Sequence, residues 1–143
     1  MAMLPFCGYN YADYFAHWLS MKGESDGSKL PKIFFVNWFR RDEDGRFLWP
    51  GFGENSRVLK FVFDRCDGNG DVINTPIGKL PVPGSLDIDG LKIDAADLEA
   101  LLTVDSDGWK QAVPQIREHF ARFGDKLPDE LIAAVDKLES SLA

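Results

Sequence analysis

Apolar residues three or four positions apart recur along several stretches of this chain, and that spacing predicts amphipathic helices. Asn55 or Ser56 is expected to cap one helix, and Asp94 is expected to cap another. Pro114 lies inside a third helix and removes a backbone donor, so we expect a kink or a restart there. The predicted helices are 11–21, 55–66, 94–104, 107–123 and a last one opened by Pro128, whose inward stripe is Leu131, Val135, Leu138 and Leu142.

A different pattern separates the first two helices. The uninterrupted apolar run Ile33–Phe39 is typical of a strand covered on both faces. The turn signal Asp42–Gly45 follows it and lies between two aromatic-rich segments, so a β-hairpin is predicted. Further along, glycines in 67–71 are expected to end a helix, and prolines in 74–91 suit edge strands and extended connections.

The loop length of the predicted hairpin decides which aromatic rings share a face. A two-residue loop pairs Arg41 with Leu48. That register sends Phe39 and Phe47 to opposite faces of the ribbon. A three-residue loop, with Gly45 in the left-handed region, pairs Arg41 with Phe47 and lets Phe39 and Phe47 serve one pocket. The glycine favours this second register.

Together these elements predict an α+β fold in which helices pack around a small β-hairpin or sheet. A chain of 143 residues with 45% hydrophobic content can bury one core, so a single domain over 1–143 is expected. Its predicted parts are a helix and loop at 1–30, a hairpin, loop and helix at 31–66, a Pro-rich extended connection at 67–93 and a helical tail at 94–143.

Composition narrows the function classes. The net charge of −7 argues against a nucleic-acid-binding surface, which needs a basic patch. No apolar run approaches the length of a membrane span, and the first residues lack the layout of a signal peptide. Cys7 and Cys66 are isolated thiols without metal-ligand spacing, which suits a reducing compartment. A cytoplasmic location is therefore expected.

Catalytic and metal-binding patterns are weak in this sequence. The two histidines, His17 and His119, belong to no Cys/His cluster, so no zinc site is predicted. The acidic loop 67–71 invites a calcium interpretation, but Val72 and Gly78 occupy the positions where an EF-hand requires Gly and Glu. No nucleophile elbow is present. The residues alone indicate binding and not catalysis.

The stretch Phe47–Arg57 concentrates aromatic rings, glycines and a side-chain amide where a predicted strand gives way to a helix. Glu54 and the lack of a Gly-Lys-Ser/Thr sequence make it a poor phosphate loop. Flat rings stack on purines, and the Asn55 amide offers a donor and an acceptor that match the O6 and N1–H edge of guanine. The alternative is that Phe47, Trp49 and Phe52 are core residues beside a glycine turn.

The amino-acid sequence of this stretch closely resembles that of the GTP-dependent phosphoenolpyruvate carboxykinases. The resemblance covers essentially the whole chain and implies the C-terminal portion of a longer α/β enzyme domain. The segments that carry it are Phe47–Arg57, Phe35–Arg40, Pro5–Asn10, Ala16–Met21 and Thr75–Gly78.

This resemblance implies a lyase that converts oxaloacetate and GTP into phosphoenolpyruvate, GDP and CO₂ in gluconeogenesis. It implies Mg²⁺ at the phosphates and Mn²⁺ at the substrate, with the phosphate loop, metal ligands and catalytic residues lying upstream and none in this chain. What it places here is the guanine site, in which Phe52 stacks and Asn55 reads the base edge. The implied site residues are Phe39, Phe47, Phe52, Gly53, Glu54 and Asn55.

We expect the isolated chain to have no carboxykinase activity and to bind GTP weakly or not at all. Surfaces that face the rest of such an enzyme should be bare, and self-association through them is expected. The rival hypothesis is a non-catalytic module whose exposed aromatic ribbon binds a partner protein or peptide.

Overall fold

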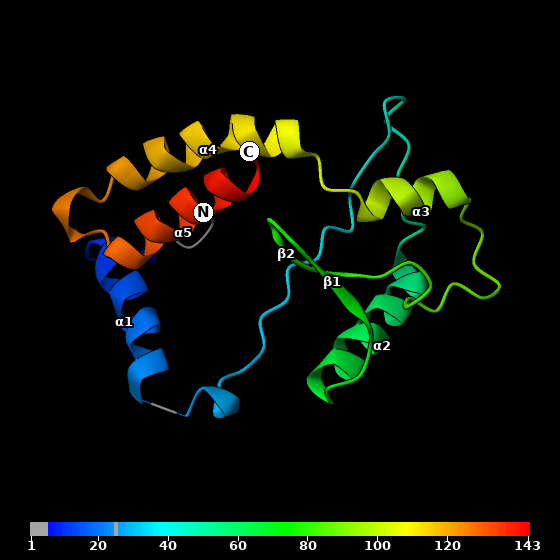
Figure 1. Cartoon of the computed structure of the whole chain (residues 1–143), viewed down its shortest axis with the longest axis horizontal. Coiled ribbons are helices and arrows are strands. Elements are labelled where there is room, and N and C mark those ends of the chain that lie inside the picture. The colour runs from blue at the N-terminus through cyan, green and yellow to red at the C-terminus, as the bar shows by residue number, and fades with distance from the viewer. Residues whose placement is uncertain (1–5, 25) are drawn as a thin grey trace. The chain divides into compact units, whose positions relative to one another are not determined.

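The computed structural model describes residues 6–24 and 26–143, which divide into two compact units (Figure 1). The first unit joins the described residues up to Pro31 with Asp105–Ala143, and the second is Lys32–Val104. The described part of the chain is helix-rich with a two-stranded antiparallel sheet, which agrees with the predicted α+β class. The single-domain partition stays a prediction. No helix within the described ranges is both long and apolar enough to cross a membrane.

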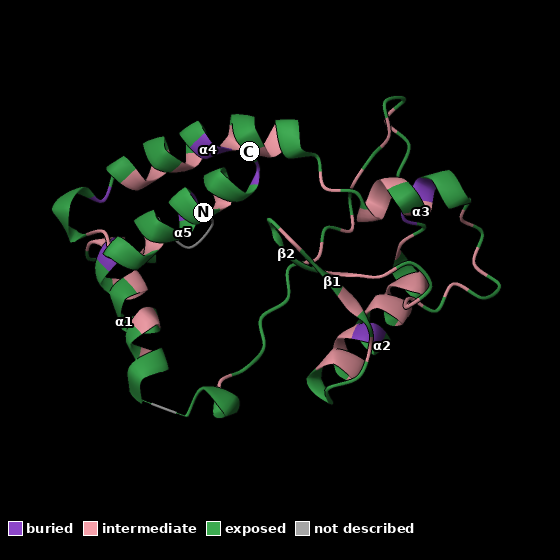
Figure 2. Cartoon of the chain, in the orientation of Figure 1, coloured by how far each residue is buried: buried purple, intermediate pink, exposed green. Residues whose placement is uncertain are grey.

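Helices form the first unit. Its core is Val113, Val135 and Leu142, so most of the predicted stripe of the last helix is confirmed, and Leu138 packs against that core (Figure 2). Phe15 of the first helix meets Phe123 edge-on, with ring centroids 5.4 Å apart. The elements are α1 (Tyr11–Glu24), the 3₁₀ turn η2 (Gly27–Lys29), α4 (Ser106–Ala121), the 3₁₀ turn η4 (Gly124–Lys126) and α5 (Asp129–Ser141).

Pro114 lies inside α4 without interrupting it, so the predicted restart is wrong. The helix begins one residue before the predicted start, where the Asp105 carboxylate accepts from the Gly108 N–H at 2.9 Å. Gly124 follows the end of α4 with φ +65°, a left-handed conformation that suits glycine, as predicted.

The second unit carries the sheet and two helices. Its β1 pairs antiparallel with β2 in the register Val72↔Pro81 and Thr75↔Gly78. The Asp94 carboxylate accepts from the Asp97 N–H at 2.7 Å, so the predicted cap is confirmed. The elements are the 3₁₀ turn η3 (Phe52–Glu54), α2 (Asn55–Cys66), β1 (Val72–Thr75), β2 (Gly78–Pro81) and α3 (Ala95–Leu102).

The predicted strand at Ile33–Phe39 is wrong, because this run belongs to no strand and its last two residues, Trp38 and Phe39, lie in a turn. Within the second unit no neighbouring segment pairs along it, and a strand needs such a hydrogen-bonded neighbour. Instead of being covered on both faces, the Phe35 side chain is 96% exposed.

The predicted hairpin turn is present, and its register is the three-residue one. An isolated antiparallel bridge joins Arg41 to Phe47. The Asp42 N–H donates to the Arg46 carbonyl at 3.0 Å, and Gly45 has φ +81°. Left-handed Gly45 therefore closes the loop in the way that its sequence position favours.

Candidate functional site

Two of the predicted ring residues lie together on this hairpin. The Phe39 and Phe47 ring centroids are 6.2 Å apart with an interplanar angle of 60°. Both rings are exposed, whereas Leu48 and Trp49, which follow Phe47, are buried. Phe47 is thus turned outward at the bridge to Arg41, while the two residues that follow it are both buried. The prediction that Phe47 is a core residue is therefore wrong, while the same prediction for Trp49 is confirmed.

One side of the Phe47 ring is occupied. The Arg41 guanidinium carbon lies 4.0 Å from the ring centroid, which is a cation–π contact. Arg41 Nη1 also donates to the Gly45 carbonyl at 2.8 Å, so the guanidinium is held at the turn. A flat ligand that stacks on Phe47 would therefore use the opposite face.

Phe52 stands apart from this pair. Its side chain is 98% exposed, and among the described residues its ring belongs to no aromatic pair. Its backbone has φ +37°, the one non-glycine residue with positive φ in the described ranges. Left-handed backbone costs an ordinary L-residue roughly 1–2 kcal/mol. Gly51, immediately before it, has φ +79° and ψ −171°, a region open almost only to glycine.

Asn55 is held by a neighbour that the sequence pattern assigned to the core. Trp49 Nε1 donates to the Asn55 Oδ1 at 2.9 Å. The prediction that Asn55 caps α2 is therefore wrong. Its side-chain oxygen accepts from Trp49, and Asn55 itself lies inside the first turn of the helix. Ser56 does not cap the helix either, since its hydroxyl donates to the Gly53 carbonyl at 2.8 Å.

The charge of Glu54 is paired within the same turn. Its Oε2 accepts from the Arg57 Nε at 2.6 Å, and Arg57 also reaches the Asp87 carboxylate at 3.3 Å. The hydrogen bond to Glu54 is the main reason that the pKa of Arg57 is raised. The negative charge predicted at this loop is therefore offset by a fixed cation.

The hairpin is fastened to α3 at both ends of that helix. Arg46 makes two hydrogen bonds to the buried Asp97 carboxylate, at 2.8 and 2.7 Å. Arg40 Nη1 donates to the Leu101 and Thr103 carbonyls at 3.3 and 3.4 Å, close to the end of α3. Sequence reasoning missed these contacts, because nothing local to the turn indicates a partner 51 residues away.

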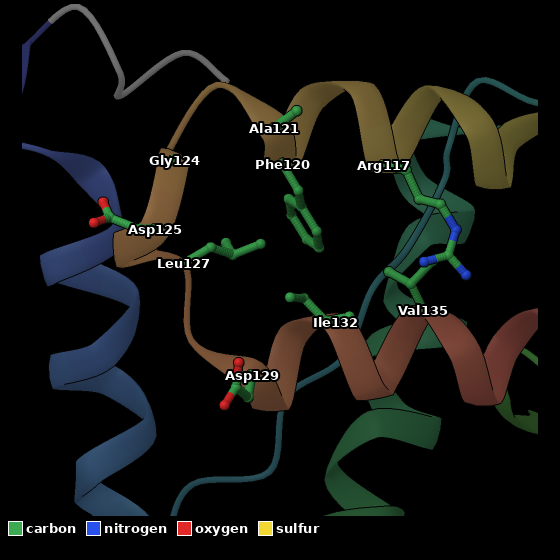
Figure 3. Close-up of a pocket in the computed structure, with 9 residues that line it drawn as sticks. All are labelled: Arg117, Phe120, Ala121, Gly124, Asp125, Leu127, Asp129, Ile132 and Val135. Atoms are coloured by element: carbon green, nitrogen blue, oxygen red, sulfur yellow. The ribbon is translucent and has the colours of Figure 1, made fainter.

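A cavity of about 380 Å³ lies in the first unit, and none of the predicted ring residues lines it. Phe120 of α4, Ile132 of α5 and Leu127 between them point into it (Figure 3). Within the described ranges, no group of three or more His, Cys, Asp or Glu residues could hold a metal ion.

Comparison with known proteins identifies the family. The family described as "Phosphoenolpyruvate carboxykinase C-terminal P-loop domain" matches residues 1–141. The chain belongs to the GTP-dependent phosphoenolpyruvate carboxykinase family. The predicted resemblance is thus confirmed over essentially the whole sequence.

Relatives named phosphoenolpyruvate carboxykinase [GTP] come from distant organisms. The chain is 55% identical over 142 residues to the Neocallimastix frontalis protein and 49% identical over 142 residues to that of Treponema pallidum (strain Nichols). It is 48% identical over 143 residues to the protein of Arthrobacter sp. (strain FB24). These matches cover 99%, 99% and 100% of this chain and 23% of each relative.

Proposed function

We propose that this chain supplies the guanine-recognising part of a GTP-dependent phosphoenolpyruvate carboxykinase, within a larger α/β enzyme domain. Such an enzyme converts oxaloacetate and GTP into phosphoenolpyruvate, GDP and CO₂ in gluconeogenesis. The observation that carries the proposal is the exposed pair Phe39 and Phe47, 6.2 Å apart, followed a few residues later in the chain by the turn that presents Phe52 and Asn55. Exposed rings next to a side-chain amide are the groups that a purine requires.

In the proposed site the base stacks on the free face of Phe47, with Phe39 at its edge. Phe52 then closes over the base from the Gly51–Glu54 turn. Two features of Phe52 support that role: its backbone is strained, and its ring pairs with no other aromatic ring in the part of the chain that the structure describes. Strained backbone is concentrated at ligand-binding sites. Each stacked ring contributes roughly 1–3 kcal/mol.

The rest of the proposed reaction is assigned to residues outside this chain. Mg²⁺ at the phosphates and Mn²⁺ at the substrate would stabilise the charge that develops on the phosphoryl group and the enolate. We assign neither metal to residues of this sequence, in which Gly53, Glu54 and the rings serve only the base. We also propose a cytoplasmic protein that uses neither nucleic acid nor membrane as a partner.

Guanosine titration of the purified chain tests the base site. We expect the tryptophan fluorescence of Trp38 and Trp49 to respond to guanosine with an affinity of about 1 mM, and far less to adenosine. Phe39→Ala should remove the response, whereas the exposed Trp18→Phe in the first unit should leave it unchanged. Equal responses to both nucleosides would refute guanine recognition.

An activity assay tests the assignment of catalysis to residues outside the chain. The purified chain with oxaloacetate, GTP and Mn²⁺ should give no turnover above the protein-free control. Robust formation of phosphoenolpyruvate would show that the catalytic groups lie within these 143 residues.

A second candidate function is self-association, favoured by exposed apolar side chains in the second unit. Ile33, Phe35 and Phe63 are all exposed there. Large exposed apolar groups mark interaction surfaces. Sedimentation of the wild-type chain should then show concentration-dependent dimers that Phe35→Asp abolishes, and a monomer at all concentrations would exclude this function.

A further inference from the structure

The Trp49–Asn55 hydrogen bond determines which way the Asn55 amide points. The indole N–H is a donor and has no acceptor capacity, so the amide atom 2.9 Å from it has to be the oxygen. The amide nitrogen then lies on the other side of the group. Trp49 is 5% exposed and Asn55 lies in the first turn of α2, so one partner is held by burial and the other by the helix.

This orientation matters because a side-chain amide is nearly symmetric in shape. Guanine presents the O6 acceptor beside the N1–H donor, whereas adenine presents an amino donor beside the N1 acceptor. An Asn amide that is free to turn over about its last bond can match either pattern. Stacking rings do not discriminate, since every base has a π face. Discrimination therefore needs a further group that fixes the amide.

We propose that Trp49 is the specificity-determining residue of this site, because it holds the Asn55 amide in the orientation that matches a 6-oxopurine. The inference rests on the proposed guanine site. Oδ1 has two lone pairs, so one accepts from Trp49 and the other is left for the N1–H of the base. Nδ2 is left to donate to O6.

Adenine would require the opposite orientation of the amide. Turning the amide over would set its NH₂ group against the Trp49 N–H, donor against donor. A buried indole N–H would then lose its acceptor, which is unfavourable. Rejection of adenine is thus built into the contact between Trp49 and Asn55, independently of Phe39 and Phe47.

Inosine and adenosine are the matched probes for this inference. They carry the same sugar and differ only in the pattern at C6 and N1, and neither has the 2-amino group of guanosine. We would titrate both into the ¹⁵N-labelled chain and follow its amide resonances. The wild type should prefer inosine by about tenfold. Trp49→Phe should lower that preference to about one, chiefly by gaining affinity for adenosine. Trp18→Phe, in the other unit, should keep the wild-type preference.

The outcomes separate this inference from the proposed function. If Trp49→Phe keeps the wild-type preference for inosine, Trp49 does not set specificity, and the guanine site stands. If the wild type binds neither nucleoside, the proposed site itself fails and the inference fails with it. Equal binding of both nucleosides by the wild type would leave a purine-stacking surface and overturn the inference.

A second variant keeps the test decisive if Trp49→Phe does not fold. Asn55→Asp retains an oxygen acceptor for Trp49 and removes the donor that faces O6. Its affinity for inosine should fall by about tenfold or more, and its preference should move toward adenosine. A persisting preference for inosine in Asn55→Asp would overturn the assignment of Nδ2 to the 6-oxo group.

Discussion

At the residue scale, Phe52 combines a left-handed backbone with almost complete exposure of a large apolar ring. Both features are unfavourable in a free protein: the φ of +37° strains the residue, and the ring, left in water, gives up the stabilisation that burial would provide. Neither packing nor folding accounts for a phenylalanine at this position. The proposed stacking on a base would account for both features, so Phe52 is the residue whose removal should separate binding from stability.

Phe52→Ala should therefore leave stability unchanged within about 0.5 kcal/mol, because the side chain makes almost no contact in the folded chain. Affinity for guanosine should fall by about tenfold, in line with the loss of one stacked ring. Urea unfolding and a guanosine titration measure the two effects. A clear loss of stability with unchanged affinity would mean that Phe52 serves the fold.

Gly51→Ala should destabilise the chain by about 1–3 kcal/mol, because alanine is strained at φ +79° and ψ −171°. No other atom lies within 4 Å of a Cβ added there, so the effect comes from the backbone alone. Gly53 is the matched control, since it has equal space and no positive φ. Gly53→Ala should be nearly neutral in urea unfolding, and equal losses at both positions would contradict this account.

At the element scale, the hairpin and α2 differ in how their positions are maintained. The α2 helix has its own backbone hydrogen bonds and buries Phe61, whereas the hairpin has few backbone pairs and relies on side chains that reach α3. The bidentate pair of Arg46 with Asp97 is the strongest of these contacts. The hydrogen bond from Arg46 lowers the pKa of Asp97 and, with it, raises that of Arg46.

Acid should weaken the second unit through Asp97. A carboxyl whose pKa is lower in the folded state stabilises the fold above its unfolded value of about 3.9, and that contribution is lost as the pH falls through the folded value. Unfolding midpoints at pH 7 and pH 3 should differ more for the wild type than for Asp97→Asn. Equal acid sensitivity of the two proteins would show that this ion pair contributes nothing.

The packing of α4 against α5 allows a separate prediction about the stability of the first unit. Val113 is 2% exposed at the centre of its core, so Val113→Ala should cost about 2 kcal/mol through lost burial and a cavity. Ile132, which is partly exposed, is the control and should cost less when changed to alanine. Guanosine affinity should not change in either variant, as measured by the same titration.

At the scale of the whole molecule, the sequence predicted what depends on local periodicity. The bounds of α2 agree with the prediction, and Asp94 caps α3, because both follow from neighbouring residues. Gly45 selected the hairpin register for the same reason. The run Ile33–Phe39 was predicted wrongly, because a strand depends on a partner segment and not on its own apolar pattern.

For the candidate site, the sequence predicted the kinds of side chain present but not the hydrogen bonds between them. The chemistry of the aromatic rings and the amide suggested a purine, the family resemblance named the site residues, and Phe39 and Phe47 do lie together. The hydrogen bond from Trp49 was not foreseen, because a tryptophan in an apolar pattern counts as core, and its N–H partner depends on the turn between the two residues. The sequence predicted Asn55 as a helix cap because asparagine is preferred at that position. This preference takes no account of a competing donor such as the Trp49 N–H.

In the proposed site, Phe39, Phe47 and Phe52 bind one guanine base. Nuclear Overhauser contacts from the H8 proton of bound guanosine, recorded on the chain with labelled phenylalanine rings, test this most directly. We predict contacts from the base to all three rings, with Phe52 drawn toward Phe47. Guanosine that binds without contacting these rings, or that contacts only residues of α4 and α5, would contradict the claim.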